Sequence, residues 1–183
     1  MKRIFTILTV LLTLGVFAQN DYSLQFDGVD DYVELNSSSI FSVGNDSLLT
    51  IMTSINTTVT IGSSSIVQGW YGCGYQVYLS NGLINFVLRE PGGNGVGLLS
   101  SSSVNDGNWH NIATVLNGND VFIYIDGVLD NQGTFNNTVS GNGTDNLSFG
   151  HSPWASEFFE GNIDEVQIWN RVLSLQEIND FKT

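Results

Sequence analysis

A pair of carboxylates can do acid–base chemistry, and Glu157 and Glu160 lie near each other towards the end of the chain. A retaining glycosidase holds two carboxylates about 5 Å apart across the bond that it cleaves. These two glutamates are close in sequence, but they fall in a segment that reads as a turn. The sequence also contains neither a Gly-x-Ser-x-Gly elbow nor a His-Glu-x-x-His zinc motif. We therefore expect no catalytic residues and no enzymatic activity.

Carboxylates dominate the charge of the chain, with 18 Asp and Glu against five Lys and Arg and a net charge of −13. Proteins that bind nucleic acid use a basic patch to displace counterions. The charge therefore argues against nucleic acid and against anionic membrane surfaces as partners. Most carboxylates are expected to serve solubility, but some could hold a divalent cation, because calcium prefers carboxylate and carbonyl oxygens. The sequence has no EF-hand spacing, so such a site would be assembled from distant segments.

Residues 1–18 have the composition of a secretory signal peptide, in which Lys2 and Arg3 precede an apolar run that ends at Phe17. The run is shorter than the roughly 20 residues of a membrane span. An uncleaved membrane anchor is the alternative. We expect a secreted or cell-surface protein whose mature part, residues 19–183, forms one domain and is not inserted in the membrane. That part keeps three basic and 18 acidic residues, a formal charge of −15.

Short apolar runs alternate with clusters of Gly, Asn, Ser and Thr along the mature chain, which is typical of an all-β sandwich. The expected strands are 23–26, 32–35, 48–56, 65–68, 75–80, 83–89, 97–100, 109–116, 121–125, 128–132, 146–150 and 161–169. Asn81-Gly82 and Asp126-Gly127 predict tight hairpin turns, because both dipeptides tolerate positive φ. Ser174 and Glu177 match a capping box and predict a short helix over 174–181.

Four segments, in this order, resemble motifs of laminin-G-like domains in the concanavalin A-like lectin/glucanase superfamily. They are residues 24–34, 106–113, 123–127 and 163–174, which include Asp27-Gly28, Asp106-Gly107-Asn108-Trp109-His110, Asp126-Gly127 and Ile163-Asp164-Glu165. The resemblance implies a two-sheet antiparallel jelly-roll sandwich with a short C-terminal helix, in which the first and last strands are neighbours. Glucanases of this superfamily use the pattern Glu-x-Asp-x-x-Glu, which this chain lacks.

The resemblance also implies a structural calcium ion where the first and last strands meet, and it assigns that role to Asp27 and Asp164. Asp30 and Asp31 are weaker candidates for the same site. As an alternative, Asp27 caps the turn 28–31 through an Asx-type bond and Asp164 does the same locally.

Sugar binding uses aromatic rings that stack on the apolar faces of pyranoses. The candidates lie in or beside Gly-rich or Pro-containing loops, where binding residues are common, and they are Trp70, Tyr71, Tyr75 and Trp154. As an alternative, these rings belong to the core of the sandwich. Trp109 is expected in the core, and His110 is expected to be a hydrogen-bonded structural histidine. His151 could reach a ligand or belong to a plain loop.

These features predict a secreted, non-catalytic, lectin-like module that binds a polysaccharide or glycan and is stabilised by calcium. The alternative is a protein-adhesion or spacer domain of the bacterial cell surface, with a surface protein as its partner. Cys73 is the sole cysteine, so no disulfide can form within the chain. We expect it to be a small buried side chain.

Overall fold

The computed structural model describes residues 23–36, 43, 47–69, 74–90, 93–136, 138–139, 146–152, 155 and 157–181. The expected signal peptide lies outside the described residues, and so do Cys73 and three of the candidate ligand residues, Trp70, Tyr71 and Trp154.

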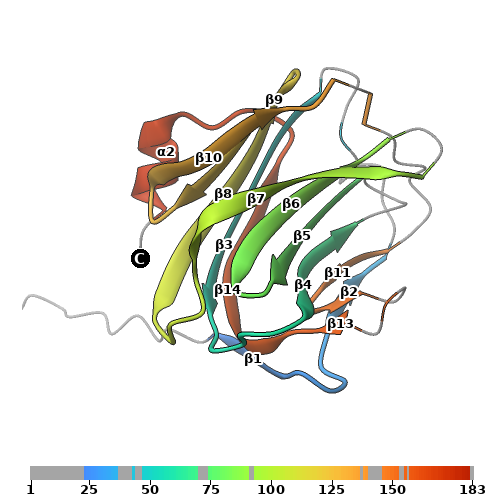
Figure 1. The fold of residues 1–183 in the computed structure, drawn as a ribbon, viewed down its shortest axis with the longest axis vertical. Coiled ribbons are helices and arrows are strands. Elements are labelled where there is room, and N and C mark those ends of the chain that lie inside the picture. Colours follow the sequence, from blue (N-terminus) through green and yellow to red (C-terminus); the bar gives the residue numbers. More distant parts are fainter. Residues whose placement is uncertain are drawn as a thin grey trace, which may run out of the picture.

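The described part of the chain is built almost entirely of strands, which confirms the all-β prediction (Figure 1). The elements are β1 (Leu24–Asp27), β2 (Val33–Leu35), β3 (Leu48–Asn56), β4 (Ser63–Gly69), β5 (Tyr75–Ser80), β6 (Leu83–Arg89), β7 (Gly95–Ser103), β8 (Trp109–Asn117), β9 (Asp120–Ile125), β10 (Val128–Thr134), β11 (Leu147–Phe149), β12 (His151–Ser152), β13 (Glu157–Phe158), β14 (Glu160–Trp169) and helix α2 (Leu175–Asp180).

Two antiparallel six-stranded sheets form the sandwich. Sheet A has the order β1-β14-β3-β8-β9-β10, and sheet B has the order β2-β11-β4-β5-β6-β7. The first and last strands pair directly, with Leu24 opposite Ile163 and Asp27 opposite Glu160, as expected. The jelly-roll architecture implied by the resemblance is therefore confirmed.

The inner faces of the two sheets pack on one continuous apolar core. Ile51 and Ile112 enter it from sheet A, and Val77 and Phe86 enter it from sheet B; each is at most 1% exposed. Burying an aliphatic or aromatic side chain of this size contributes roughly 1.5–3 kcal/mol. Since the chain has a single cysteine, no disulfide within it adds to the stability that this core provides.

The outer face of sheet A has an apolar region, which the C-terminal segment with helix α2 covers. Met52, Ala113 and Val115 form a second buried cluster there with Leu173 and Ile178 from the C-terminal segment. The helix begins with the predicted capping box. No helix in the described part of the chain is long and apolar enough to cross a membrane.

Both predicted hairpin turns are present. Asn81 and Gly82 have φ of 49° and 83°, and Asp126 and Gly127 have φ of 52° and 74°, so each turn has two successive residues of positive φ. The hairpin of β12 and β13 was not predicted, because two-residue strands are too short to show an alternating pattern.

Candidate functional site

The outer face of sheet B carries a group of polar side chains, with the apolar Val87 and Leu99 beside them. On β5, Tyr75, Val77 and Leu79 are buried in the core. Successive side chains of a strand point to opposite faces of the sheet. Gln76 and Tyr78 therefore project away from the core.

The strand register brings further polar side chains beside these two. Ser65 and Asn85 flank Tyr78 on the neighbouring strands, and Gln68 lies opposite Gln76. Ser148 lies opposite Gln68 on the far side of β4. Together these residues form what we call the polar face of sheet B: Ser65, Gln68, Gln76, Tyr78, Asn85 and Ser148. From strand spacing, each row of three spans roughly 10 Å and the rows are about 7 Å apart.

Part of this polar face is buried, although a polar sheet surface is normally solvated. Ser65 is 0% exposed and Gln68 is 3% exposed. The Ser65 hydroxyl oxygen and the side-chain carbonyl oxygens of Gln68 and Asn85 are buried without a hydrogen-bond partner. Each such unsatisfied group costs about 1–3 kcal/mol. These oxygens are inaccessible, so a ligand on the polar face would meet the partly exposed side chains of Gln76 and Tyr78.

Asn85 is held in place by its neighbours. Its side-chain nitrogen donates to the Tyr78 hydroxyl at 2.7 Å. Gly97 on β7 leaves room for the Asn85 amide, because a Cβ at that position would collide with the Asn85 side chain. The fixed orientation of this amide means that a ligand meets a preformed group and not a mobile one.

The β12–β13 hairpin packs against β4 and brings a carboxylate to the polar face. Burial raises the pKa of Glu157 on β13. Burial also raises the pKa of Tyr78, the hydrogen bond from Asn85 lowers it, and the charge of Glu157 raises it further. The Glu157 carboxylate thus lies near enough to influence the Tyr78 hydroxyl.

His151 on β12 belongs to an aromatic stack at this edge of the site. Its ring is 4.4 Å from the Phe158 ring, nearly parallel to it, and 5.1 Å from the Tyr32 ring. Burial lowers the pKa of His151, while the negative charge of Glu34 acts in the opposite direction. His151 is therefore a packed side chain that supports the hairpin.

The prediction for Tyr75 as a ligand residue does not hold. Tyr75 is 0% exposed and packs in the core, because it shares the inward face of β5 with Val77 and Leu79. The sequence prediction considered only aromatic residues in loops. The alternation of apolar and polar residues along β5 and β6 is the signal that identifies Gln76, Tyr78 and Asn85 as outward-facing polar residues.

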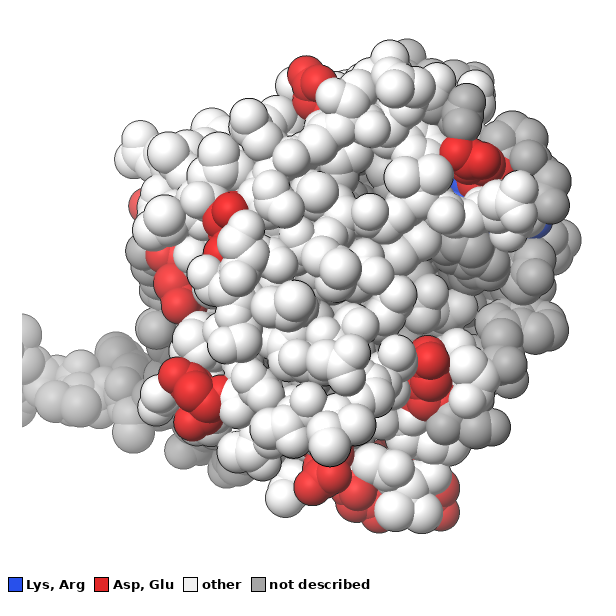
Figure 2. Space-filling model, viewed as in Figure 1, with Lys and Arg blue, Asp and Glu red and all other residues white. Residues whose placement is uncertain are grey.

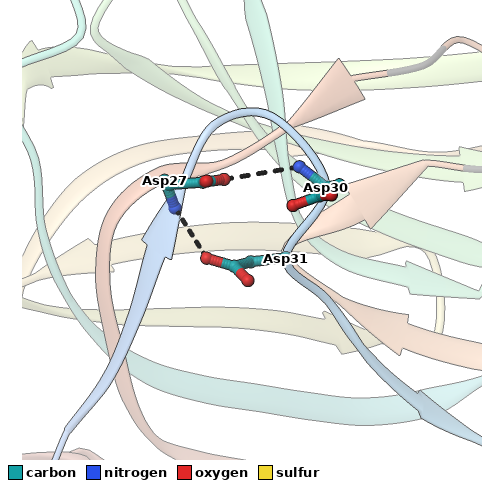
Figure 3. Close-up of side chains that lie close together, drawn as sticks. All are labelled: Asp27, Asp30 and Asp31. Carbon is teal, nitrogen blue, oxygen red and sulfur yellow. Dashed lines mark hydrogen bonds between the residues drawn. The ribbon is translucent and has the colours of Figure 1, made fainter.

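The candidate metal site includes an acidic turn that follows β1. Carboxylate oxygens of Asp27, Asp30 and Asp31 lie within 4.8 Å of one another (Figure 3). One Asp27 oxygen accepts hydrogen bonds from the amides of Val29 at 2.8 Å and Asp30 at 3.3 Å. Asp31 accepts from the Asp27 amide at 3.1 Å. The Asx-type cap proposed as the alternative for Asp27 is therefore present.

Asp164 does not join this turn. Asp27 lies opposite Glu160, and Asp164 is four residues further along β14, about 13 Å away at strand spacing. Asp164 instead accepts a hydrogen bond from the Glu165 amide at 2.8 Å, beside a β-bulge. A single site that uses both Asp27 and Asp164 is therefore not supported by the strand register.

A comparison with protein-family models finds a match over residues 27–179 to the model Laminin_G_3, described as concanavalin A-like lectin/glucanases superfamily. The chain belongs to the concanavalin A-like lectin/glucanases superfamily. No curated protein matches the chain in sequence.

Solved structures share the superfamily fold at low sequence identity. The binding domain of Paraclostridial Mosquitocidal Protein 1 has a TM-score of 0.72 and 15% identity, over 85% of this chain and 42% of that one. The binding domain of botulinum neurotoxin DC in complex with SialylT has a TM-score of 0.64 and 14% identity, over 85% and 40% of the two chains. The CBM40 of Ruminococcus gnavus IT-sialidase has a TM-score of 0.65 and 18% identity, over 87% and 97%. The chain thus spans less than half of each toxin binding domain and nearly all of the CBM40.

The two glutamates that could have formed a glucanase-like pair face different surroundings. Glu157 lies on β13, and its charge raises the pKa of Tyr78 on sheet B. Glu160 lies against Gly28 beside the acidic turn, where a Cβ on the glycine would come within 3.0 Å of the Glu160 Cβ. The two carboxylates therefore do not oppose each other across one bond.

At the start of β8, Trp109 points outwards and His110 points inwards, whereas we expected Trp109 to point into the core. Trp109 is 46% exposed, so its assignment to the core was wrong. His110 lies opposite the buried Ile55 and points to the inner side of the sheet. The error arose because alternation fixes that the two side chains differ in direction, but it does not fix which one points inwards.

His110 is a hydrogen-bonded structural histidine, as predicted. Its Nδ1 lies 2.9 Å from Asp126 and its Nε2 lies 3.1 Å from Asp106. Burial lowers the pKa of His110, but the hydrogen bonds to Asp126 and Asp106 outweigh burial and leave the pKa raised. Sequence spacing alone did not reveal these acidic partners, because Asp126 reaches His110 through the β8–β9 pairing.

Proposed function

We propose that this protein is a secreted, non-catalytic carbohydrate-binding module that holds a glycan on the polar face of sheet B. One observation carries the proposal: polar side chains from adjacent strands, among them the partly exposed Gln76, Tyr78 and Asn85, share the outer surface of sheet B. Side-chain amides and a phenol on a rigid sheet can donate hydrogen bonds to the hydroxyls of a sugar and accept hydrogen bonds from them.

A glycan suits this surface because each hydroxyl both donates and accepts hydrogen bonds. The polar face offers amide, hydroxyl and carboxylate groups from adjacent strands of a rigid sheet. The loop that joins β4 to β5 contains Trp70 and Tyr71, and the segment after β12 contains Trp154. These three residues remain our candidates for ring-stacking contacts, because the strands that precede them belong to the site or border it.

Two structural neighbours support the ligand class. One is the CBM40 of a sialidase, which is matched over nearly its whole length, and the other is a toxin binding domain in complex with SialylT. At these identities the likeness shows the fold alone. The assignment of glycan binding to this chain therefore rests on the polar face.

We also propose that the protein binds calcium, with Asp27, Asp30 and Asp31 as ligands in place of Asp27 and Asp164. Asp27, Asp30 and Asp31 bring three carboxylates together in an exposed turn, and a divalent cation would relieve their mutual repulsion. Asp27 and Asp31 each use one oxygen in turn hydrogen bonds and keep a second oxygen for a cation. The role of the ion would be to stiffen the turn that joins the edge of sheet A to sheet B.

The test is a glycan and polysaccharide array probed with residues 19–183, followed by calorimetry of the best ligand. We expect Gln76→Ala to weaken binding about tenfold, the loss expected for one or two hydrogen bonds. Gln167→Ala is the matched control, because Gln167 is also half-buried but lies on β14 of sheet A. Absence of binding to every glycan would contradict the proposal and favour the adhesion or spacer function. Equal losses in both variants would contradict the location of the site.

A further inference from the structure

We propose that the groove between β14 and helix α2, on the outer face of sheet A, is a second binding site, which receives a lysine or arginine side chain from a basic segment of a partner protein. The groove is separate from the polar face of sheet B, so the inference does not depend on the glycan-binding function proposed above.

The groove is lined by apolar and aromatic side chains. Met52 on β3 and Leu173 before the helix are its buried members, and Trp169 at the end of β14 and Phe181 at the end of helix α2 border it. Trp169 is 38% exposed, so part of its indole is open to a ligand. The groove has a volume of about 290 Å³, which is at the small end of the range for ligand sites. This size suits one long side chain better than a polysaccharide.

Most polar groups of the groove already have partners. Arg171 donates to the two carboxylate oxygens of Glu177 at 2.7 and 3.2 Å, and its guanidinium carbon lies 5.0 Å from the centre of the Trp169 ring. The indole N–H of Trp169 donates to the side-chain oxygen of Gln167 at 3.2 Å. Because Arg171 is neutralised by Glu177, it is not free to hold an anionic ligand.

Asp180 is the remaining charged residue of the groove. It is exposed at the end of helix α2, and its carboxylate has no hydrogen bond or ion pair within the part of the chain that the structure describes. The last turn of the helix has no basic residue that would offset this carboxylate and the partial negative charge of the helix end. The groove therefore attracts a cation and repels an anion.

A lysine or arginine side chain matches both the apolar lining and the unpaired carboxylate. Its methylene stem packs along apolar and aromatic surface, while its charged head donates hydrogen bonds to a carboxylate. The net charge of −13 also favours association with a basic partner through long-range attraction. Figure 2 shows acidic side chains spread over the visible surface and very little blue. We therefore expect the groove to anchor one basic side chain within a larger contact.

The first experiment titrates the unmodified chain, residues 19–183, with three capped tripeptides whose central residue is lysine, arginine or norleucine between two glycines. Norleucine keeps the linear apolar stem and lacks the charge. The NMR signal of the Trp169 indole N–H reports on the groove, and the ionic strength is held constant. We expect the lysine and arginine peptides to shift this signal and to bind about three- to fivefold more tightly than the norleucine peptide, the effect of one exposed ion pair.

Three results would overturn the inference. They are equal affinity for the norleucine peptide, no shift of the Trp169 signal with any peptide, and a shift of that signal with lactose but not with the peptides. The first two would leave the glycan-binding function standing, and the third would move the glycan site to this groove.

The second experiment assigns the preference for a cation to Asp180. Asp180→Asn keeps the shape of the side chain and removes its charge, so we expect the lysine and norleucine peptides to bind it equally. Asp120→Asn removes the same charge from an exposed position on β9 and should leave the preference unchanged. Lys182→Gln removes the basic residue nearest to Asp180 in sequence, and it should leave the preference intact or increase it. Thermal melting confirms that each variant is folded. A preference that survives in Asp180→Asn, or one that is lost in Lys182→Gln, would contradict the proposed site.

Discussion

The hydroxyl of Tyr78 lies 2.7 Å from the side-chain nitrogen of Asn85, and the two residues are directly opposite each other on β5 and β6. Because the tyrosine oxygen accepts this hydrogen bond, its own O–H can be donated to a ligand. The hydrogen bond thus fixes the Tyr78 phenol as a donor on the polar face of sheet B.

Tyr78→Phe tests the contribution of this pair. The change removes the donor and leaves the Asn85 amide nitrogen without its partner, so we expect glycan affinity to fall about tenfold and stability to fall by roughly 1 kcal/mol. Calorimetry and denaturant unfolding measure the two effects. Tyr124→Phe, on β9 of sheet A, is the control. Unchanged affinity in Tyr78→Phe would show that the ligand does not contact this part of the sheet.

Calcium binding at the acidic turn is tested with Asp30→Asn. The side chain of Asp30 can lose its charge while the turn bonds made by Asp27 and Asp31 remain. We expect calcium at about 100 times its dissociation constant to stabilise the unmodified chain by about 2.7 kcal/mol, and EDTA to reverse this. Asp30→Asn should lose most of the calcium-dependent part and match the unmodified chain in EDTA.

Asp164→Asn is the control for that experiment, because Asp164 lies about 13 Å along β14 from the turn. We expect its calcium-dependent stabilisation to remain intact. An equal loss of the calcium effect in both variants would favour a site shared by the two strands, and an absence of any calcium effect would remove the ion from the proposal.

We expect the titration of His110 to make the stability of the protein depend on pH. Hydrogen bonds to Asp126 and Asp106 leave its folded-state pKa raised above its ordinary value of 6.5. A raised histidine pKa contributes stability that is fully present below the unfolded pKa and is lost as pH rises through the folded pKa. We expect the melting temperature to decline as pH increases from about 6 to about 8, and the decline to be smaller in His110→Gln. A decline of the same size in both proteins would assign it to other groups.

Close packing around Gly150 predicts a large effect of a single methyl group. Gly150 has a φ of 79°, and a Cβ there would overlap the ring of Phe26. We expect Gly150→Ala to destabilise the protein by about 2–4 kcal/mol, from backbone strain and overpacking together. Gly62→Ala shares the positive φ, at 89°, but has open space around the new methyl group. It should cost only about 1 kcal/mol, and equal effects in denaturant unfolding would contradict a steric role for Phe26.

The sequence predicts well those features that depend on local chemistry. Asn81-Gly82 and Asp126-Gly127 determine their turns through the φ values that they tolerate, and Ser174 with Glu177 determines the start of the helix. The pairing of the terminal strands followed from the family resemblance.

Features that depend on register or on the direction of a side chain were predicted less well. Asp27 and Asp164 are expected in one site because their strands pair. The register places Asp27 opposite Glu160, which is four residues before Asp164. Tyr75 and Trp109 were each assigned to the wrong side of a strand. The polar face brings Gln68, Gln76 and Ser148 together from three strands, and no short motif contains that arrangement.

The central claim is that a glycan binds the polar face of sheet B. The most direct measurement is an NMR titration of residues 19–183 with the best glycan from the array, following the side-chain amides of the Asn and Gln residues. We expect the amides of Gln68, Gln76 and Asn85 to shift together at one dissociation constant while that of Gln167 stays in place. Shifts confined to the turn 27–31 or to the surroundings of helix α2, with the amides of sheet B unmoved, would contradict it.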